Sequence, residues 1–143
     1  MFNNYGDCVV LRDSDPGAVY AMTSTLRIPI INAGNGIDEH PTQAMADLYT
    51  IFKWRPKLAE AEVAPADRIR IGIVGIPSRM RTVRSLLRIL AKFPQTVDEV
   101  VVIHAPGLEP DQPLFDPGQL EELEACGMKV RSSTDLQAEV PDL

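Results

Sequence analysis

Residues 28–54 constrain the fold more than any other stretch, because an apolar strand, a glycine-containing loop and an amphipathic helix follow one another there. The isoleucine-rich start has strand character, and the glycines after it allow turns that other residues resist. Pro41 suits the first position of a helix, since its missing N–H would be unpaired there, and this leaves His40 at the N-cap. Apolar side chains then recur at helical spacing at Met45, Leu48, Tyr49 and Phe52.

The helix N-terminus that this stretch predicts is a place where an anion can bind. Unpaired backbone N–H groups and a partial positive charge face whatever lies in front of such a terminus. His40 and Gln43, one turn apart, can add side-chain hydrogen bonds to a carbonyl oxygen and to an amide. The same two residues also fit a simply capped helix whose His and Gln contact solvent or backbone, and the local sequence alone favours that simpler interpretation.

Strands and helices alternate along the whole chain. We expect strands at residues 7–11, 28–32, 69–74, 99–104 and 128–131, and helices at 17–27, 41–54, 83–90, 118–125 and 133–138, the last capped by Ser133 or Thr134. The charged, Ala- and Pro-containing residues 55–67 are typical of a linker or hinge, and the Pro-rich residues 105–117 of a loop. This alternation predicts an α/β fold with parallel sheets, flanking helices and right-handed crossovers.

Arg12 directly follows the first predicted strand. In open α/β sheets, ligands collect at the carboxyl ends of parallel strands, so Arg12 occupies a position where binding residues are found. The alternative is an arginine that pairs with Asp13 or Asp15 in a solvated loop.

A second group of arginines surrounds the start of the helix that follows residues 69–74. Arg79, Arg81 and Arg84 would suit a ligand that carries carboxylates or phosphate. We expect Arg84 and Arg88 to be ordinary surface arginines, which leaves Arg81 as the candidate.

The composition limits the classes of function. A net charge of -6 and a pI near 4.8 argue against a general role on nucleic acid or on a membrane surface, since both need a basic face. With 143 residues, of which 45% are hydrophobic, the chain can form one ordinary core or two small ones. Cys8 and Cys126 lie far apart and no leader segment is recognisable, so we expect a reducing cytoplasm.

Several blocks of the sequence carry a family resemblance. The stretch INAGNGIDEHPTQAMADLYTI closely resembles the carbamoyl-phosphate segment of aspartate carbamoyltransferases, and Thr42 favours this branch over the ornithine enzymes, which typically have Cys there. VVLR at residues 9–12, IGIVG at 71–75 and RTVRSLL at 81–87 extend the similarity in the same order. The resemblance covers nearly the whole chain.

The resemblance implies an activity and a set of site residues. In this family an amine attacks the carbonyl carbon of carbamoyl phosphate, and phosphate leaves. In pyrimidine biosynthesis the amine is that of L-aspartate. By resemblance, Arg12 and His40 would bind carbamoyl phosphate and polarise its carbonyl oxygen, with His40 as the catalytic residue. Gln43 would hold the amide, and Arg81 would grip a carboxylate of aspartate. The resemblance calls for no metal and no organic cofactor.

The resemblance also implies how the chain is divided and assembled. Residues 1–55 would be the C-terminal part of a carbamoyl-phosphate-binding domain, 56–68 a linker or hinge, and 69–143 the N-terminal part of an aspartate-binding domain, both domains being Rossmann-like. The expected partners are carbamoyl phosphate, L-aspartate, and either copies of the chain in a trimer-type homo-oligomer or a complementary carbamoyltransferase chain.

The sequence departs from the family in ways that leave two other readings open. The family's main phosphate-binding signature, Ser-Thr-Arg-Thr-Arg, and its later aspartate-clamping segments do not occur here, so we expect the isolated chain to be inactive. Met80 replaces a glycine and would restrict a turn with positive φ. Asp38 and Glu39 would repel a phosphate unless they point away. The alternatives are a non-catalytic binding or assembly module and a carbamoyltransferase for another amine.

Overall fold

The computed structural model describes residues 2–107 and 113–142. The described strands are β1 (Val9–Asp13), β2 (Ile30–Asn35), β3 (Ile69–Val74), β4 (Val97–Ile103) and β5 (Lys129–Ser133). The described α-helices are α1 (Ala18–Thr23), α2 (Pro41–Trp54), α3 (Arg81–Leu90), α4 (Gln119–Ala125) and α5 (Leu136–Glu139). Short 3-10 helices lie at Phe2–Asn4, Pro56–Ala59, Pro65–Asp67, Pro77–Arg79 and Val140–Asp142.

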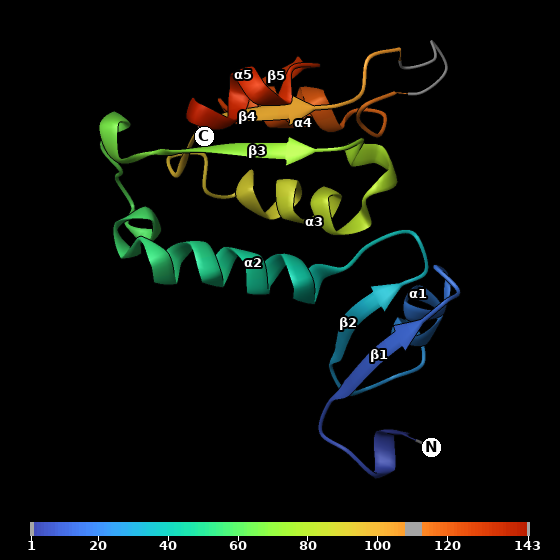
Figure 1. The fold of residues 1–143 in the computed structure, drawn as a ribbon. Coiled ribbons are helices and arrows are strands. Elements are labelled where there is room, and N and C mark those ends of the chain that lie inside the picture. Colours follow the sequence, from blue (N-terminus) through green and yellow to red (C-terminus); the bar gives the residue numbers. More distant parts are fainter. Residues whose placement is uncertain (1, 108–112, 143) are drawn as a thin grey trace.

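The strands form two parallel sheets, which confirms the predicted α/β class. One sheet has the order β1-β2, and the other has the order β3-β4-β5. Helix α1 connects β1 to β2, and α3 connects β3 to β4, as expected for parallel neighbours. Figure 1 shows α2 running beneath α3, with the β1–β2 sheet set apart near the first turn of α2.

Several boundaries differ from the prediction. Helix α1 ends at Thr23 and not at residue 27, because the hydroxyls of residues 23–25 donate to the carbonyls of the preceding turn. Arg12, expected just after the first strand, lies within β1.

Helix α2 begins at Pro41 behind the N-cap His40, as predicted. The predicted cap of α5 is wrong, because Asp135 and not Ser133 or Thr134 occupies that position. The Asp135 carboxylate accepts a hydrogen bond of 3.0 Å from the backbone N–H of Ala138. A carboxylate is as good an N-cap acceptor as a hydroxyl, so the sequence alone did not decide among the three.

The main core lies between the larger sheet and the helices beneath it. Strand β4 is its centre, since Val100 and Val102 are fully buried and pack with Leu87 and Leu90 of α3. Leu48 of α2 belongs to the same cluster. Helix α2 therefore continues directly from the smaller sheet and packs its apolar stripe onto the larger unit.

The segment between α2 and β3, expected as a linker or hinge, is packed onto the larger unit. Leu58 is 0% exposed and forms a small cluster with Val63 and Ile69. The backbone carbonyl of Leu58 accepts a hydrogen bond of 2.8 Å from the hydroxyl of Thr96. Part of the other predicted loop, residues 108–112, lies outside the described residues.

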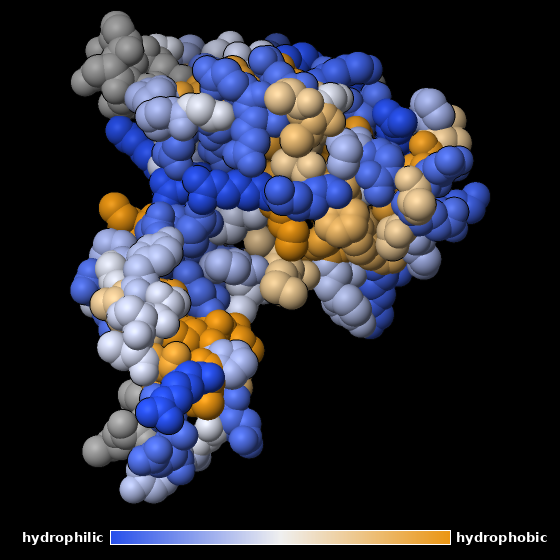
Figure 2. Space-filling model, turned by 180° about the vertical axis from the view of Figure 1, so that it is seen from behind, coloured by the Kyte–Doolittle hydropathy of each residue, from blue (hydrophilic) through white to orange (hydrophobic). Residues whose placement is uncertain are grey.

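The smaller sheet leaves an apolar face uncovered in this chain. Val10 and Ile31 are neighbours across the β1–β2 pairing and are 66% and 43% exposed. Figure 2 shows apolar side chains at the surface of the unit that β1, α1 and β2 form. Within residues 2–107 and 113–142, no helix has the length and apolar character needed to cross a membrane.

Candidate functional site

The candidate site lies where β1 and β2 end and α2 begins. Gly34 has a φ of +115°, and a Cβ placed on it would come within 3.2 Å of both the Arg12 guanidinium and the His40 ring. Gly36 has a φ of +54°, and a Cβ there would lie 2.5 Å from the backbone carbonyl of Ser14. Glycine at position 34 therefore lets the end of β2 pass close to Arg12 and His40, and glycine at position 36 lets the following turn pass close to the Ser14 carbonyl.

Arg12 and His40 are in direct contact. The Nη1 atom of Arg12 lies 3.3 Å from Nε2 of His40 and also 3.3 Å from the carbonyl oxygen of Ala33. The other ring nitrogen, Nδ1 of His40, lies 3.3 Å from the backbone nitrogen of Gln43. These contacts fit two tautomers of the ring. With the proton on Nε2, Nδ1 accepts from the Gln43 N–H; with the proton on Nδ1, Nε2 accepts from Arg12 and Nδ1 donates to the Thr42 hydroxyl at 3.4 Å.

The tautomer with the proton on Nε2 makes Arg12 and His40 a pair of donors. An Nε2–H of His40 and an N–H of Arg12 cannot satisfy one another, since both donate. In that tautomer, one acceptor, such as a carbonyl or phosphoryl oxygen, can bind to both. The structure thus brings Arg12 and His40 together, and among the described residues no ion pair joins Arg12 to Asp13 or Asp15.

Arg81, the first residue of α3, lies close to Arg12. Arg12 and Arg81 both line an open hollow of about 520 Å³, whose other lining residues are Asp13, Ser14, Gly36 and Ile37. The Nη1 atom of Arg81 donates a hydrogen bond to the carbonyl oxygen of Gly36. Two guanidinium groups, one from each sheet unit, therefore stand on one concave surface, which is an arrangement suited to a ligand with two anionic groups.

Gln43 is turned away from this hollow. Its side-chain amide donates a hydrogen bond of 2.9 Å to the carboxylate of Asp47, one turn further along α2. Gln43 is exposed and does not line the hollow. Of the predicted residues, Arg12, His40 and Arg81 are gathered together, whereas Gln43 stands at the first turn of α2 with its amide engaged elsewhere.

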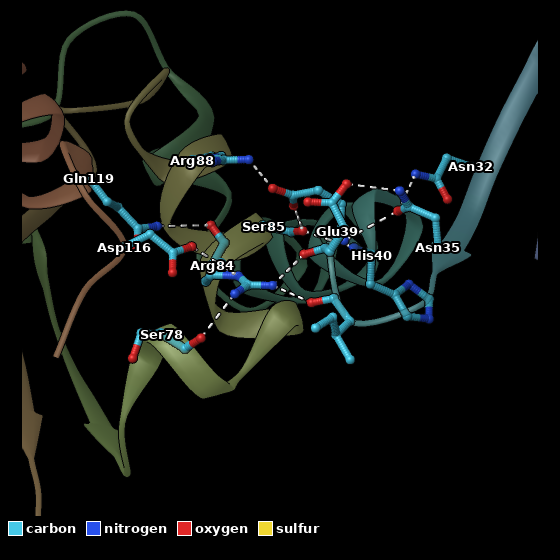
Figure 3. A network of polar contacts seen from close by, with 12 residues as sticks. Asn32, Asn35, Glu39, His40, Ser78, Arg84, Ser85, Arg88, Asp116 and Gln119 are labelled. Carbon is cyan, nitrogen blue, oxygen red and sulfur yellow. Dashed lines mark hydrogen bonds and ion pairs between the residues drawn. The ribbon is translucent and has the colours of Figure 1, made fainter. Parts of the chain in front are cut away.

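The two acidic residues before His40 do point away from it. The Glu39 carboxylate accepts a hydrogen bond from the Ser85 hydroxyl and forms an ion pair with Arg88 (Figure 3). The Asp38 carboxylate accepts hydrogen bonds of 2.9 Å from the Tyr20 hydroxyl and from the Asn35 amide. The hydrogen bond to Asp38 raises the pKa of Tyr20 above its ordinary value. Both carboxylates are therefore held by other partners and point away from the place where an anion would bind beside His40.

The expectation of an ordinary surface arginine is wrong for Arg84. The Arg88 side chain is 50% exposed and pairs with Glu39, as described above. The side chain of Arg84 is only 13% exposed and forms an ion pair of 3.3 Å with Asp116. It also donates hydrogen bonds to the carbonyl oxygens of Ile37, Asp38 and Ser78. Sequence reasoning missed this role because all the partners except Ser78 lie more than thirty positions away in the chain.

Met80 does not strain the turn before α3. Its φ is −119°, and among the described residues every positive φ belongs to a glycine. With Met80 the turn thus takes a form without a positive φ at this position, as expected of a residue with a side chain. The side chain of Met80 lies against Gly75, where a Cβ would meet the Met80 sulfur at 2.9 Å.

Within the described part of the chain, no group of three or more His, Cys, Asp and Glu is placed to hold a metal ion. Both cysteines are described, and both are free thiols.

Comparisons with known proteins agree with the geometry. The family model for the carbamoyl-P binding domain of aspartate/ornithine carbamoyltransferases matches residues 1–53. Aspartate carbamoyltransferase 1 of Pisum sativum is 44% identical over 89 residues, which is 62% of this chain and 21% of that protein. The aspartate carbamoyltransferase catalytic subunit of a Saccharolobus islandicus strain is 44% identical over 93 residues, 65% of this chain and 28% of that protein.

Solved structures give the same result over more of the chain. Aspartate transcarbamoylase from Trypanosoma cruzi in complex with N-(phosphonacetyl)-L-aspartic acid has a TM-score of 0.72 and 31% identity, with 96% of this chain and 41% of that chain covered. The catalytic subunit of M. jannaschii aspartate transcarbamoylase has a TM-score of 0.73 and 30% identity, with 95% and 40% covered. The resemblance to aspartate carbamoyltransferases is confirmed, and this chain spans about a quarter of the matched relatives and about two fifths of the solved chains.

Proposed function

We propose that this chain carries part of an aspartate carbamoyltransferase site, in which the carbamoyl group of carbamoyl phosphate passes to the amine of L-aspartate, a reaction of pyrimidine biosynthesis. Residues 1–55 contribute the carbamoyl-phosphate side, residues 56–68 connect the two parts, and residues 69–143 contribute the aspartate side. The family-model match to residues 1–53 supports this division. So do the solved relatives, one of which was crystallised with carbamoyl phosphate and aspartate.

The contact between Arg12 and His40 carries the proposal. Attack of an amine on the carbonyl carbon of carbamoyl phosphate places negative charge on the carbonyl oxygen before phosphate leaves. Donors that are already aimed at that oxygen stabilise the transition state without reorganising. With the ring proton on Nε2, the Nε2–H of His40 and the Nη1 of Arg12, 3.3 Å apart at the start of α2, form such a pair.

The remaining site residues act after a change of hydrogen-bond partner. Gln43 holds the amide of carbamoyl phosphate once its own amide leaves Asp47. Arg81 binds an aspartate carboxylate through guanidinium N–H groups other than the one that donates to the Gly36 carbonyl. Because Arg12 and Arg81 share one hollow, both substrates can approach each other there.

A second candidate function is a binding or assembly module that does not turn over substrate. The lining of the described hollow favours it, because catalysis needs contacts made in the transition state and only two guanidinium groups line this hollow. Within this proposal the isolated chain binds carbamoyl phosphate weakly and turns it over only with a partner. That partner is a set of further copies or a complementary carbamoyltransferase chain, which would cover the open face around Val10 and Ile31. We place the protein in the cytoplasm, consistent with its free thiols; the plant relatives are named chloroplastic.

The proposal is tested by calorimetry with carbamoyl phosphate and with N-(phosphonacetyl)-L-aspartate. Loss of one charge-assisted hydrogen bond costs about 1.5–3 kcal/mol, so Arg12→Ala and His40→Ala should each weaken binding by roughly 10- to 150-fold. His104→Ala removes the other of the two histidines and should leave the affinity unchanged. Equal affinities of wild type, Arg12→Ala and His40→Ala would refute the site.

A separate assay tests turnover. The purified chain is incubated with carbamoyl phosphate and L-aspartate, and carbamoyl aspartate is measured against the uncatalysed background. Product above background from the chain alone would refute the binding-module candidate. The absence of product together with His40-dependent binding would support it.

A further inference from the structure

Arg84 stands between three segments of the chain and binds all of them. Its Nε pairs with the Asp116 carboxylate at 3.3 Å, its Nη1 donates to the Ser78 carbonyl at 2.9 Å, and its Nη2 donates to the carbonyls of Ile37 and Asp38. Figure 3 shows this guanidinium between the α3 helix and the loop that leads to His40. Within the described residues the guanidinium therefore donates three hydrogen bonds to carbonyl oxygens and forms one ion pair.

Two of these partners belong to the turn that immediately precedes His40. Within the turn, the Asp38 N–H donates to the Asn35 carbonyl at 3.0 Å, and the Asn35 N–H donates to the Glu39 carbonyl at 3.1 Å. These bonds leave the carbonyls of Ile37 and Asp38 without a partner inside the turn. Arg84 supplies that partner from α3, so the turn can keep this conformation in a half-buried place.

The geometry of the guanidinium is essential to this arrangement. Its donors diverge in one plane, and so they reach a carboxylate and carbonyls on two different segments at once. A lysine at the same position would carry the same charge on one nitrogen and could not span these partners. Arg84 thus differs from Arg88, whose single partner in this region is the Glu39 side chain.

We propose that Arg84 is a positioning residue of the candidate site: it fixes the turn at residues 35–39 so that His40 enters α2 with Nδ1 on the Gln43 N–H and Nε2 toward Arg12. The significance of that geometry for carbamoyl transfer rests on the proposed function. The positioning itself is a property of the ligand-free protein, and it can be tested without a substrate.

The test uses the nitrogen resonances of the histidine rings. The chain has two histidines, so uniformly ¹⁵N-labelled protein gives two ring systems, and His104 serves as the internal reference. In the wild type, Nδ1 of His40 should show the shift of an unprotonated nitrogen and Nε2 that of a protonated one. In Arg84→Ala and Arg84→Lys, the turn is released, and the His40 shifts should move toward a mixture of both tautomers while those of His104 stay in place.

Control variants separate positioning from simple stabilisation. Asp116→Asn removes the ionic partner of Arg84 but leaves the carbonyl contacts, and Lys129→Ala removes an exposed cation paired with Asp98 on the larger sheet. Both should keep the wild-type His40 shifts. A merely stabilising Arg84 would lower the unfolding temperature of its variants without changing the His40 ring in the folded molecules.

The outcomes are decisive in either direction. Wild-type His40 shifts in folded Arg84→Lys overturn the proposal, and this variant decides the matter if Arg84→Ala does not fold. Carbamoyl phosphate affinity is then measured on the same samples, and Arg84→Lys should bind roughly 10-fold more weakly than Lys129→Ala. If the wild type binds no carbamoyl phosphate while the His40 shifts respond to Arg84→Lys, the proposed function fails and the positioning role stands.

Discussion

The small cluster around Leu58 predicts that the segment between α2 and β3 contributes to stability and is not a free tether. Leu58 is fully buried against Val63 and Ile69, and its backbone carbonyl binds the Thr96 hydroxyl. Leu58→Ala would leave a cavity at the point where the segment attaches to the larger sheet. The expected result is a protein that unfolds more readily and opens first in this segment.

The size of the effect follows from the burial. The substitution removes about three side-chain carbons at roughly 0.8 kcal/mol each, to which the cavity adds a further cost, so we expect about 3 kcal/mol. For a chain of this length, one kcal/mol shifts the unfolding temperature by about 2–4 °C, which gives a decrease of roughly 6–12 °C. Val10→Ala on the open sheet face is the matched control, and a change at such an exposed site should stay within about 0.5 kcal/mol.

Thermal unfolding by circular dichroism measures the decrease, and limited trypsin digestion locates it. Lys57 and Arg68 flank the cluster, so Leu58→Ala should be cleaved after these residues faster than the wild type. If the free energy of unfolding falls by less than about 1 kcal/mol and the rate of cleavage equals that of the wild type, the cluster does not hold the segment and residues 56–68 are a flexible hinge.

Two further predictions concern side chains that have a defined partner. Asp47→Ala removes one i,i+4 hydrogen bond, worth about 0.2–0.5 kcal/mol, and so frees the Gln43 amide. The affinity for carbamoyl phosphate, measured by calorimetry, should therefore rise by roughly twofold. A weaker affinity would show that Asp47 holds Gln43 in its binding conformation. Hydrogen bonding to Arg131 lowers the pKa of Glu139 from 4.5 to about 2, so the stability contributed by this carboxylate is complete above pH 4.5 and is lost as the pH falls toward 2. Denaturation of wild type and Glu139→Gln should therefore differ at pH 7 and converge near pH 2, and a constant difference would contradict this reasoning.

Local chemistry made the backbone of the candidate site predictable. The N-cap role of His40 follows from Pro41 behind it, and the loop follows from two glycines, one of which must pass the Arg12 and His40 side chains closely. Strand β3 was likewise recognisable as an apolar run. Each of these inferences uses residues within a few positions of one another, which is the range over which sequence patterns reflect structure.

Contacts between segments distant in the chain were not predictable in the same way. Nothing in the sequence around Arg84 and Arg88 distinguishes them from surface arginines. Their roles depend on residues 37–39, which only the packing of α2 on α3 brings near them. The burial of Leu58 in a charged segment has the same origin. A single sequence specifies such partners only through the completed fold.

The acidic residues beside His40 show how this limitation changes a functional argument. Counting charges along residues 38–40 suggests a site hostile to anions. In the folded chain, α3 compensates one acid with Arg88, while Tyr20 and Asn35 bind the other, and so neither carboxylate faces the Arg12–His40 pair. A chain with a net charge of -6 can therefore present two guanidinium groups on one hollow, because Asp38 and Glu39 have partners of their own and Asp13 is the acid that remains in the lining. It follows that Arg88→Ala should weaken anion binding in the hollow, because it releases the Glu39 carboxylate, although Arg88 itself does not line the hollow.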